Sequence, residues 1–481
     1  MKSIRIIIFI TVMAVFTSCE DYLEPAPTSV ISGASFYADE AQLMQGVYNM
    51  YDGLQGANDT SSRSNHATQI EYYVTEMRSD NTRSKSGEGE AAQFDNLAVE
   101  ATNGLIADHY RSFYNVIFRA NTVLQNLGVA SESNKAKIEG EAKFIRAYVY
   151  FNLVRLYGAI PLLDNVIGVS DDASYIRRPV ADVYDLIVSD LNSAVAGLDN
   201  TNGRNRATKA AAQGLLAKVH LTLGNYLDAQ QLLESVMSEG FALEPSFSDV
   251  FFNESNSEVI FAIGYASGLV QDSQNFSAEF LNGVGRTVGV NYVTDDAKAF
   301  MEANGGDRTV VSMRTDPIQP TQTQVTKFLP DGFDGGSDGK TFDFDARLAG
   351  NDWIVLRYAD ILLMHVEAIM GSSNETNATA ALASFQQVRD RAGLTDAVTS
   401  ITKDDLLAER RAELAFENQR LYDIMRFGKG IDILGAYAVA IGANFTSNDL
   451  LLPFPQIEIG LSKGLLAVSY THLTLPTSQL V

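Results

Sequence analysis

Apolar residues recur at the spacing of an α-helix through most of this 481-residue chain. Residues three and four positions apart share a helix face, so this spacing predicts helices that bury one side. The predicted helices cover residues 39–51, 105–127, 135–157, 183–198, 354–370, 376–392, 403–417 and 418–430, with a helical pair over 207–239. Each helix needs a neighbour to cover its apolar face, and an all-α dominated fold is therefore expected.

The helical pair over 207–239 has the most diagnostic spacing. Leu216 lies eight residues before Gly224, and Tyr226 and Ala229 follow that glycine. These positions match the tetratricopeptide pattern, in which the Gly ends one helix and the small Ala lets the next helix pack closely. The last two predicted helix pairs of the chain are amphipathic in the same way. We therefore expect an α-solenoid scaffold, in which each pair buries a face on its neighbour.

Residues 241–350 interrupt the helical pattern. This stretch is rich in Gly and aromatic residues, and it ends in a turn-dense loop over 331–339. The apolar run over 259–263 predicts a short strand. We interpret the stretch as a loop-rich lobe with a few short strands, inserted between helical scaffolds at 36–240 and 351–467. Long insertions on a rigid scaffold often carry function.

The only cysteine of the chain, Cys19, follows a segment with the features of a signal peptide. Lys2 and Arg5 precede an apolar run too short to span a bilayer, and two small residues come just before the cysteine. This pattern predicts a lipoprotein signal peptide over 1–18, lipid attachment at Cys19 and an extended tether over 19–35. The alternative is an ordinary secretory signal followed by a cysteine by chance.

The charge and the cysteine count exclude several classes of protein. The formal net charge is −23, which argues against nucleic acid as a partner. If Cys19 is lipidated, no thiol is left for a disulfide or a thiolate metal site. No two of the five histidines lie four residues apart, so the zinc pair of a helix is absent. We expect no metal and no cofactor, and His220 and His365 are interpreted as packing residues of helices.

Three acidic residues, Glu409, Glu413 and Glu417, lie on one face of a predicted helix. Paired carboxylates could act as a glycosidase dyad. Like charges at this spacing also repel one another and need cationic partners, and Arg410 and Arg420 lie three residues from members of the set. We favour a structural lattice of Arg and Glu side chains that ties helical pairs together, and no catalytic residue is predicted.

Binding of a sugar needs aromatic faces together with planar polar groups that satisfy the hydroxyls. Loops near 60–100 and the inserted lobe provide both kinds of side chain. The candidate ligand-binding residues are Tyr72, Tyr73, Arg78, Asp80, Asn81, Phe94, Tyr265, Phe280 and Tyr292. For each aromatic residue the alternative is packing in the core. Arg63, Arg78, Arg83 and Lys85 form a local basic cluster, interpreted as a solvated loop or as a contact for an acidic sugar.

Five segments, in order along the chain, resemble signatures of the SusD/RagB-type nutrient-binding lipoproteins of Bacteroidetes. They lie at 36–48, 141–162, 353–368, 409–427 and 452–458. The resemblance implies four tetratricopeptide-like helical pairs that support a variable lobe. It also implies a lipid-anchored protein on the outer face of the outer membrane, which binds a nutrient, most often a glycan. Its implied partner is a SusC-like TonB-dependent transporter, and it implies no catalysis.

Residues 468–481 depart from the family pattern and are interpreted as a non-native tail. Two other functions are open on the sequence alone. A membrane-anchored α-helical glycoside hydrolase requires an acidic pair with a raised pKa in a cleft. A tetratricopeptide scaffold for protein partners requires a peptide groove on the concave helical face and no aromatic platform in the lobe.

Overall fold

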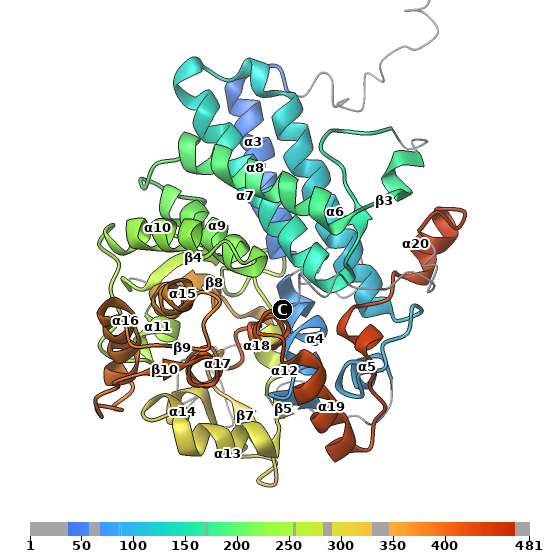
Figure 1. Cartoon of the computed structure of the whole chain (residues 1–481). Coiled ribbons are helices and arrows are strands. Elements are labelled where there is room, and N and C mark those ends of the chain that lie inside the picture. The colour runs from blue at the N-terminus through green and yellow to red at the C-terminus, as the bar shows by residue number, and fades with distance from the viewer. Residues whose placement is uncertain are drawn as a thin grey trace, which may run out of the picture.

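The computed structural model describes residues 37–56, 68–85, 87, 89–168, 172–253, 256–281, 291–329 and 346–466. The predicted signal peptide, Cys19, the tether and the tail over 468–481 lie outside the described residues, as does Arg63. Helices dominate the described part, which confirms the predicted fold class (Figure 1). No helix within these ranges combines the length and apolar character needed to cross a membrane.

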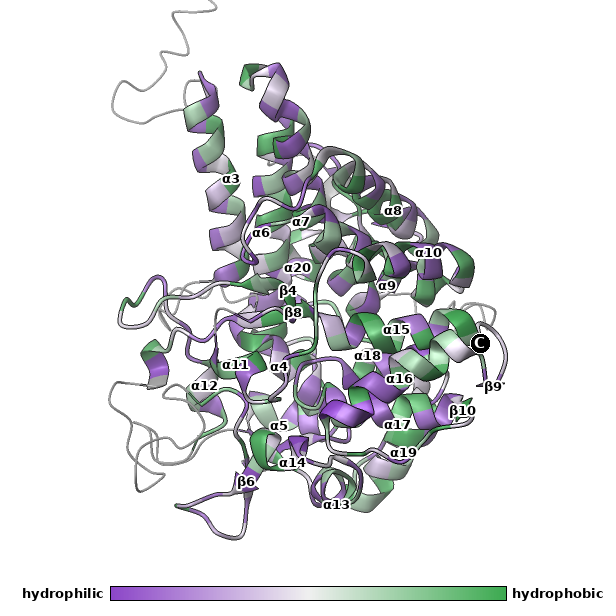
Figure 2. Cartoon of the chain, turned by 90° about the vertical axis from the view of Figure 1, so that its left-hand side faces the viewer, coloured by the Kyte–Doolittle hydropathy of each residue, from purple (hydrophilic) through white to green (hydrophobic). Residues whose placement is uncertain are grey.

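Four long helices form the N-terminal part of the scaffold, at the top of Figure 1. They are α3 (Glu40–Gln55), α6 (Gly104–Gln125), α7 (Glu132–Tyr157) and α8 (Val180–Gly197). From Phe144 to Leu156 almost every residue of α7 is buried, because α6 and α8 pack against it from two sides. Figure 2 shows polar and apolar residues side by side along these helices, the colouring expected where each helix buries one face.

The scaffold continues through α9 (Lys209–Leu223) and α10 (Tyr226–Met237), which both contact α15 (Tyr358–Met370). Helix α15 in turn packs against α16 (Thr379–Arg391). The tetratricopeptide motif is confirmed at the α9–α10 turn. Gly224 closes α9 with φ 77° and ψ 13°, a left-handed conformation that favours glycine. Leu216 and Ala229 are buried, so the two helices pack closely where the motif places them.

Three of the predicted helices differ from the structure in their bounds or continuity. Residues 353–357 form strand β8 (Trp353–Arg357), which pairs antiparallel with the correctly predicted strand β4 (Val259–Ile263), and the helix begins only at Tyr358. The β-branched Ile354 and Val355 favour this extended conformation. The predicted helix 418–430 is divided into α18 (Arg420–Arg426) and α19 (Gly430–Ile441), because the chain turns at Gly428 with φ 70°. Helix α17 (Lys403–Glu413) is shorter than predicted.

The lobe adds a four-stranded sheet in the order β1 (Thr82–Ser84), β5 (Asn291–Val293), β7 (Thr323–Val325) and β6 (Met313–Thr315). Strand β1 pairs antiparallel with β5, so that Arg83 lies opposite Tyr292. The loops near 60–100 and the inserted lobe, the two sources of the candidate ligand residues, therefore meet in one sheet. The lobe also contains four helices, α11 (Asp249–Phe252), α12 (Phe276–Glu279), α13 (Asp295–Asn304) and α14 (Arg308–Ser312), of which α14 contacts β6.

The remaining elements are short and link the layers. They are α4 (Glu71–Val74), α5 (Glu90–Asp95), α20 (Gln456–Leu461), the strand pair β2 (Ile160–Pro161) and β3 (Arg177–Arg178), and the pair β9 (Glu375–Thr376) and β10 (Ile401–Thr402). One large apolar cluster extends from α3 through α7 and α9 to α15, so the helical layers and the lobe share a core.

Candidate functional site

Most of the aromatic residues proposed from the sequence are buried in the structure. Tyr72 and Tyr73 lie with ring centroids 4.2 Å apart, and Phe280 and Phe94 extend the same cluster at 5.3 and 5.8 Å. Tyr265 donates from its hydroxyl to the carbonyl of Gln55 at 2.7 Å and is also buried. Their rings pack on other side chains in this conformation, which leaves no free face for a sugar.

The polar candidates join the α4–β1 segment to the C-terminal helices. Arg78 is buried and donates from Nη2 to the carbonyls of Asp449 at 2.8 Å and Leu450 at 3.0 Å. Asp80 accepts two bonds from Arg420, at 2.7 and 2.8 Å. Burial alone would raise the pKa of Asp80, but the hydrogen bonds and charge of Arg420 bring it below its usual value. Asn81 accepts from Arg411 at 3.0 Å, so all three residues have structural contacts.

The part-exposed residues of this region lie where β1 meets β5. The guanidinium of Arg83 lies 5.9 Å from the ring centroid of Tyr292 and 3.5 Å from a carboxylate oxygen of Asp95. Tyr437 donates to the other oxygen of Asp95 at 2.8 Å, which fixes that carboxylate. Burial lowers the pKa of Lys85, on the same side of the sheet, to about 8, although the charge of Asp316 opposes the shift. We call Arg83, Lys85 and Tyr292 the β1–β5 edge.

The predicted lattice of Arg and Glu side chains exists, but its partners differ from those expected. Arg357 contacts Glu258, Glu413 and Glu417 at 2.8, 2.6 and 2.8 Å. Arg308 joins Glu409 to Glu413, at 2.6 and 2.9 Å.

Arg410 and Arg420, the partners inferred from sequence spacing, point elsewhere. Arg410 pairs with Asp360 and Asp423, and Arg420 pairs with Asp80. The expectation failed because spacing along one helix does not show which cations arrive from other elements.

The electrostatics of this lattice do not suit a glycosidase acid. Burial alone would raise the pKa of Glu413, but the charges of Arg391, Arg357 and Arg308 bring it far below its usual value. The pKa of Glu417 is also lowered, because Arg357 and Lys327 outweigh its burial. A general acid needs a raised pKa so that it carries a proton at working pH. These two carboxylates are therefore held ionised as structural ion pairs.

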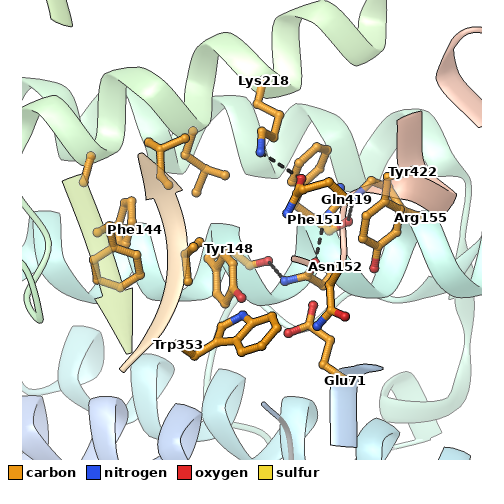
Figure 3. A pocket seen from close by; sticks show the side chains of 16 residues that line it. Glu71, Phe144, Tyr148, Phe151, Asn152, Arg155, Lys218, Trp353, Gln419 and Tyr422 are labelled. Atoms are coloured by element: carbon orange, nitrogen blue, oxygen red, sulfur yellow. Dashed lines mark hydrogen bonds between the residues drawn. The ribbon is translucent and has the colours of Figure 1, made fainter. Parts of the chain in front are cut away.

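A small interior pocket of about 30 Å³ is lined by Glu71, a carboxyl group whose pKa is raised rather than lowered (Figure 3). Burial raises the pKa of Glu71 to about 7, although the charge of Arg155 opposes the shift. Figure 3 shows its carboxyl pointing toward Asn152, which donates to the carbonyl of Tyr148 at 3.2 Å. The volume suits about one or two water molecules, so a sugar cannot reach Glu71 here.

The histidines of the described helices pack as the sequence suggested. His365 is buried in α15, with Nδ1 2.9 Å from the hydroxyl of Ser384. Nδ1 of His220, on α9, lies 3.2 Å from the side-chain nitrogen of Asn225. Among the described residues, no three His, Cys, Asp or Glu side chains are grouped as metal ligands would be.

A much larger cavity, of about 1370 Å³, lies between the two halves of the scaffold. Its walls come from the end of α7, the β3–α8 junction, the α9–α10 turn, the end of α15, α18 and the segment 446–454. The sequence did not reveal this cavity, because its lining comes from many separate segments. Apart from the adjacent Arg177 and Arg178, its basic residues lie far apart in the sequence.

Comparison with known proteins gives two family matches. Residues 21–221 match the SusD-like family described as "Starch-binding associating with outer membrane", and residues 280–451 match the SusD/RagB model, described as the SusD family. The chain is 27% identical to SusD-like protein P2 of Formosa agariphila, over 94% of this chain and 96% of the relative. It is 26% identical to a SusD-like protein of Bacteroides ovatus, over 88% and 82% of the two chains.

Solved structures show the same fold. A laminarin-binding SusD-like protein superposes with a TM-score of 0.72 at 24% identity, covering 88% of this chain and 98% of that one. Surface glycan-binding protein A from Bacteroides thetaiotaomicron, in complex with laminarihexaose, gives 0.72 at 19% identity, covering 89% and 99%. The matches extend over both helical scaffolds and the lobe, as the sequence signatures implied.

Proposed function

Because this chain belongs to the SusD/RagB-type family of Bacteroidetes, we propose that it captures a glycan at the cell surface without altering it. The bound oligo- or polysaccharide then passes to a SusC-like TonB-dependent transporter in the outer membrane. Similar proteins have been solved with laminarihexaose and with a xylogluco-oligosaccharide, which supports a glycan as the ligand class.

The observation that carries this proposal on the chain itself is the pairing of β1 with β5. It joins the two segments that the sequence identified as sources of ligand contacts. The half-buried ring of Tyr292 and the part-exposed guanidinium of Arg83 lie at this edge. An aromatic face together with a planar cation is the combination that holds a sugar ring and its hydroxyls. We therefore propose the β1–β5 edge as part of the glycan site.

Anchoring through Cys19 belongs to the same proposal. Lipid chains attached there would hold the protein on the outer membrane, because each buried methylene contributes about 0.8 kcal/mol. The extended tether over 19–35 would let the scaffold move relative to the membrane while the anchor stays in place.

The proposal excludes a hydrolase, and two features support that exclusion. Glu413 and Glu417 are buried in ion pairs, and the pocket at Glu71 is too small for a sugar. A hydrolase would release shorter sugars from its ligand, whereas the proposed protein returns the ligand unchanged.

The test is a calorimetric screen of residues 29–467 against a panel of oligosaccharides, with chromatography of each sugar after incubation. The expected result is binding of at least one glycan with no shortened product. A parallel purification of the full-length protein from membranes should bring a barrel transporter with it. Absence of any glycan binding, together with absence of a barrel partner, would overturn the proposal.

A further inference from the structure

The cavity between the scaffold halves is large for a small-molecule site. Its volume of about 1370 Å³ exceeds the range of roughly 300–1,000 Å³ that is usual for ligand pockets. Its lining includes the β3–α8 junction, Phe454, Gly371 and Lys403 at the start of α17. A cavity of this size and extent has room for an oligomer rather than a single sugar or ion.

The charge of the lining is opposite to that of the whole protein. Seven cationic side chains line the cavity: Arg78, Arg155, Arg177, Arg178, Lys218, Lys403 and Arg426. Three carboxylates line it, and each is already engaged. Glu367 and Asp423 pair with Arg426, and Asp449 caps η6 (Ser447–Leu450) through Thr446. On a chain with a net charge of −23, this basic interior is a local reversal of sign.

Four of the seven cations form no ion pair with the described residues and meet neutral groups instead. Arg155 donates to the carbonyl of Phe151 at 2.9 Å, and its guanidinium lies 3.5 Å from the ring centroid of Tyr422. Arg177 lies 5.6 Å from the ring centroid of Phe454, and Lys403 is half-buried. Arg78 is held by backbone carbonyls alone. Neutral acceptors leave the positive charge in place, so the cavity keeps a positive potential.

Aromatic rings line the same space. Tyr157, Tyr184, Tyr422 and Phe454 are buried in the walls, whereas Tyr226 and Phe427 are part-exposed. Rings provide faces for the C–H surfaces of sugars, and free cations provide partners for anionic substituents. A small inorganic anion would leave most of the volume and every ring unused, while a long polyanion would meet the acidic outer surface.

From this juxtaposition we propose that the cavity is a second binding site, selective for a short acidic oligosaccharide with carboxylate or sulfate groups. No residue of the β1–β5 edge lines the cavity, so this site is separate from the proposed glycan site. The acidic substituents bind Arg177 and Lys403, and the sugar rings pack against the part-exposed rings of Tyr226 and Phe427.

The experiment uses the chain without its signal peptide and four probes. Hexagalacturonate and sulfated laminarihexaose are acidic, while fully methyl-esterified hexagalacturonate and unmodified laminarihexaose are their neutral counterparts. Calorimetry should show at least one acidic probe bound about tenfold or more tighter than its neutral counterpart, because hydrogen bonds to charged groups are the stronger class. The affinity should fall as salt is added.

The matched variants are the double substitution Arg177→Gln/Lys403→Gln and a control, Lys135→Gln/Lys298→Gln, which removes the same charge from surface positions outside the cavity. The cavity variant should weaken binding of the acidic probe by about tenfold or more, and the control should not. Equal affinity for acidic and neutral forms, no binding of either acidic probe, or an unchanged cavity variant would overturn the proposal.

The glycan proposal can fail independently of this one. Tyr292→Ala should weaken binding of the glycan at the β1–β5 edge and leave binding of the acidic probe unchanged. If Tyr292→Ala weakens binding of the acidic probe as much as the cavity variant does, the two sites are one and the second site is refuted.

Discussion

The guanidinium of Arg357 contacts both the side chain and the backbone of Glu413. Nη1 lies 2.6 Å from Oε1 of Glu413, and Nη2 donates to the main-chain carbonyl of the same residue at 2.8 Å. Arg357 is the last residue of β8 and Glu413 the last of α17. The pair therefore joins α17 to β8, the strand that pairs with β4 of the lobe. Both side chains are fully buried, so removing one of them would leave the charge of the other buried without its partner.

Replacing Arg357 with Met is expected to destabilise the protein by about 3–5 kcal/mol, because it leaves three buried carboxylates short of a counter-ion. Urea unfolding of the two proteins measures the difference. The control is Arg178→Met, whose pair with Asp182 is exposed and should contribute only about 0–1 kcal/mol. A loss below 1 kcal/mol for Arg357→Met would show that the remaining cations of the lattice are sufficient.

Glu71→Gln is expected to change how stability depends on pH. The folded pKa of Glu71 is about 7 and its usual value is 4.5, so ionisation is harder in the folded state. The stability from its protonated form is fully present below about pH 4.5 and is lost as the pH rises through about 7. Glutamine stays neutral, so the variant should gain up to about 3 kcal/mol over the parent between pH 5 and pH 8.

Unfolding in urea at the two pH values measures this gain. Burial also raises the pKa of Glu76, so the effect of Glu71 is measured as the difference between parent and variant. Glu239→Gln, at an exposed position, should leave the parent's pH dependence unchanged. A parallel pH dependence of parent and Glu71→Gln would contradict a buried, hard-to-ionise Glu71.

Tyr292→Ala is expected to lower the affinity for the glycan found in the screen by about tenfold, because a ring face is lost at the β1–β5 edge. A matched control exists on another face of the protein. Tyr48 is 48% exposed and its ring centroid lies 5.5 Å from the guanidinium of Arg206, a pair similar to Tyr292 and Arg83. Tyr48→Ala should bind the glycan as the parent does. Calorimetry of the three proteins tests whether the edge, rather than any exposed tyrosine, holds the sugar.

Cys19→Ser is expected to abolish lipid attachment and release the protein from the membrane fraction, because the hydroxyl cannot replace the thiol as the acyl acceptor. Mass spectrometry of the N-terminal peptide and fractionation of cells measure both effects. Ser18→Ala keeps a small residue before the cysteine and should remain acylated. An unmodified Cys19 in the parent protein would contradict the lipoprotein assignment.

The helical scaffold was predictable because its signal is periodic and local. The apolar spacing located nearly every long helix, and the Leu216–Ala229 motif identified the α9–α10 turn. The boundary at Trp353 was missed because a short buried strand and a buried helix share the same apolar character. Pairing with β4 decided between them, and that contact joins residues almost a hundred positions apart.

The site was harder to predict, for a physical reason. A tyrosine in a loop has the same sequence signature whether it faces solvent or the core, and Tyr72 and Phe280 turned out to face each other. The partners of Arg410 and Arg420 come from elements distant in the sequence, which single-helix spacing cannot reveal. The large cavity could not be predicted for the same reason, because each segment of the chain contributes only a few of its lining residues.

The register of β1 against β5 also has a consequence for the order of folding. Thr82 pairs with Val293, so the four-stranded sheet cannot form until the chain has been synthesised well past its midpoint. Helices α6 to α9 pack mainly on their neighbours along the chain and can assemble earlier, while distant pairings close slowly. A chain stopped before residue 291 is therefore expected to keep much of its helical content yet lack the paired edge, so that a nascent protein becomes competent for capture only late in its synthesis.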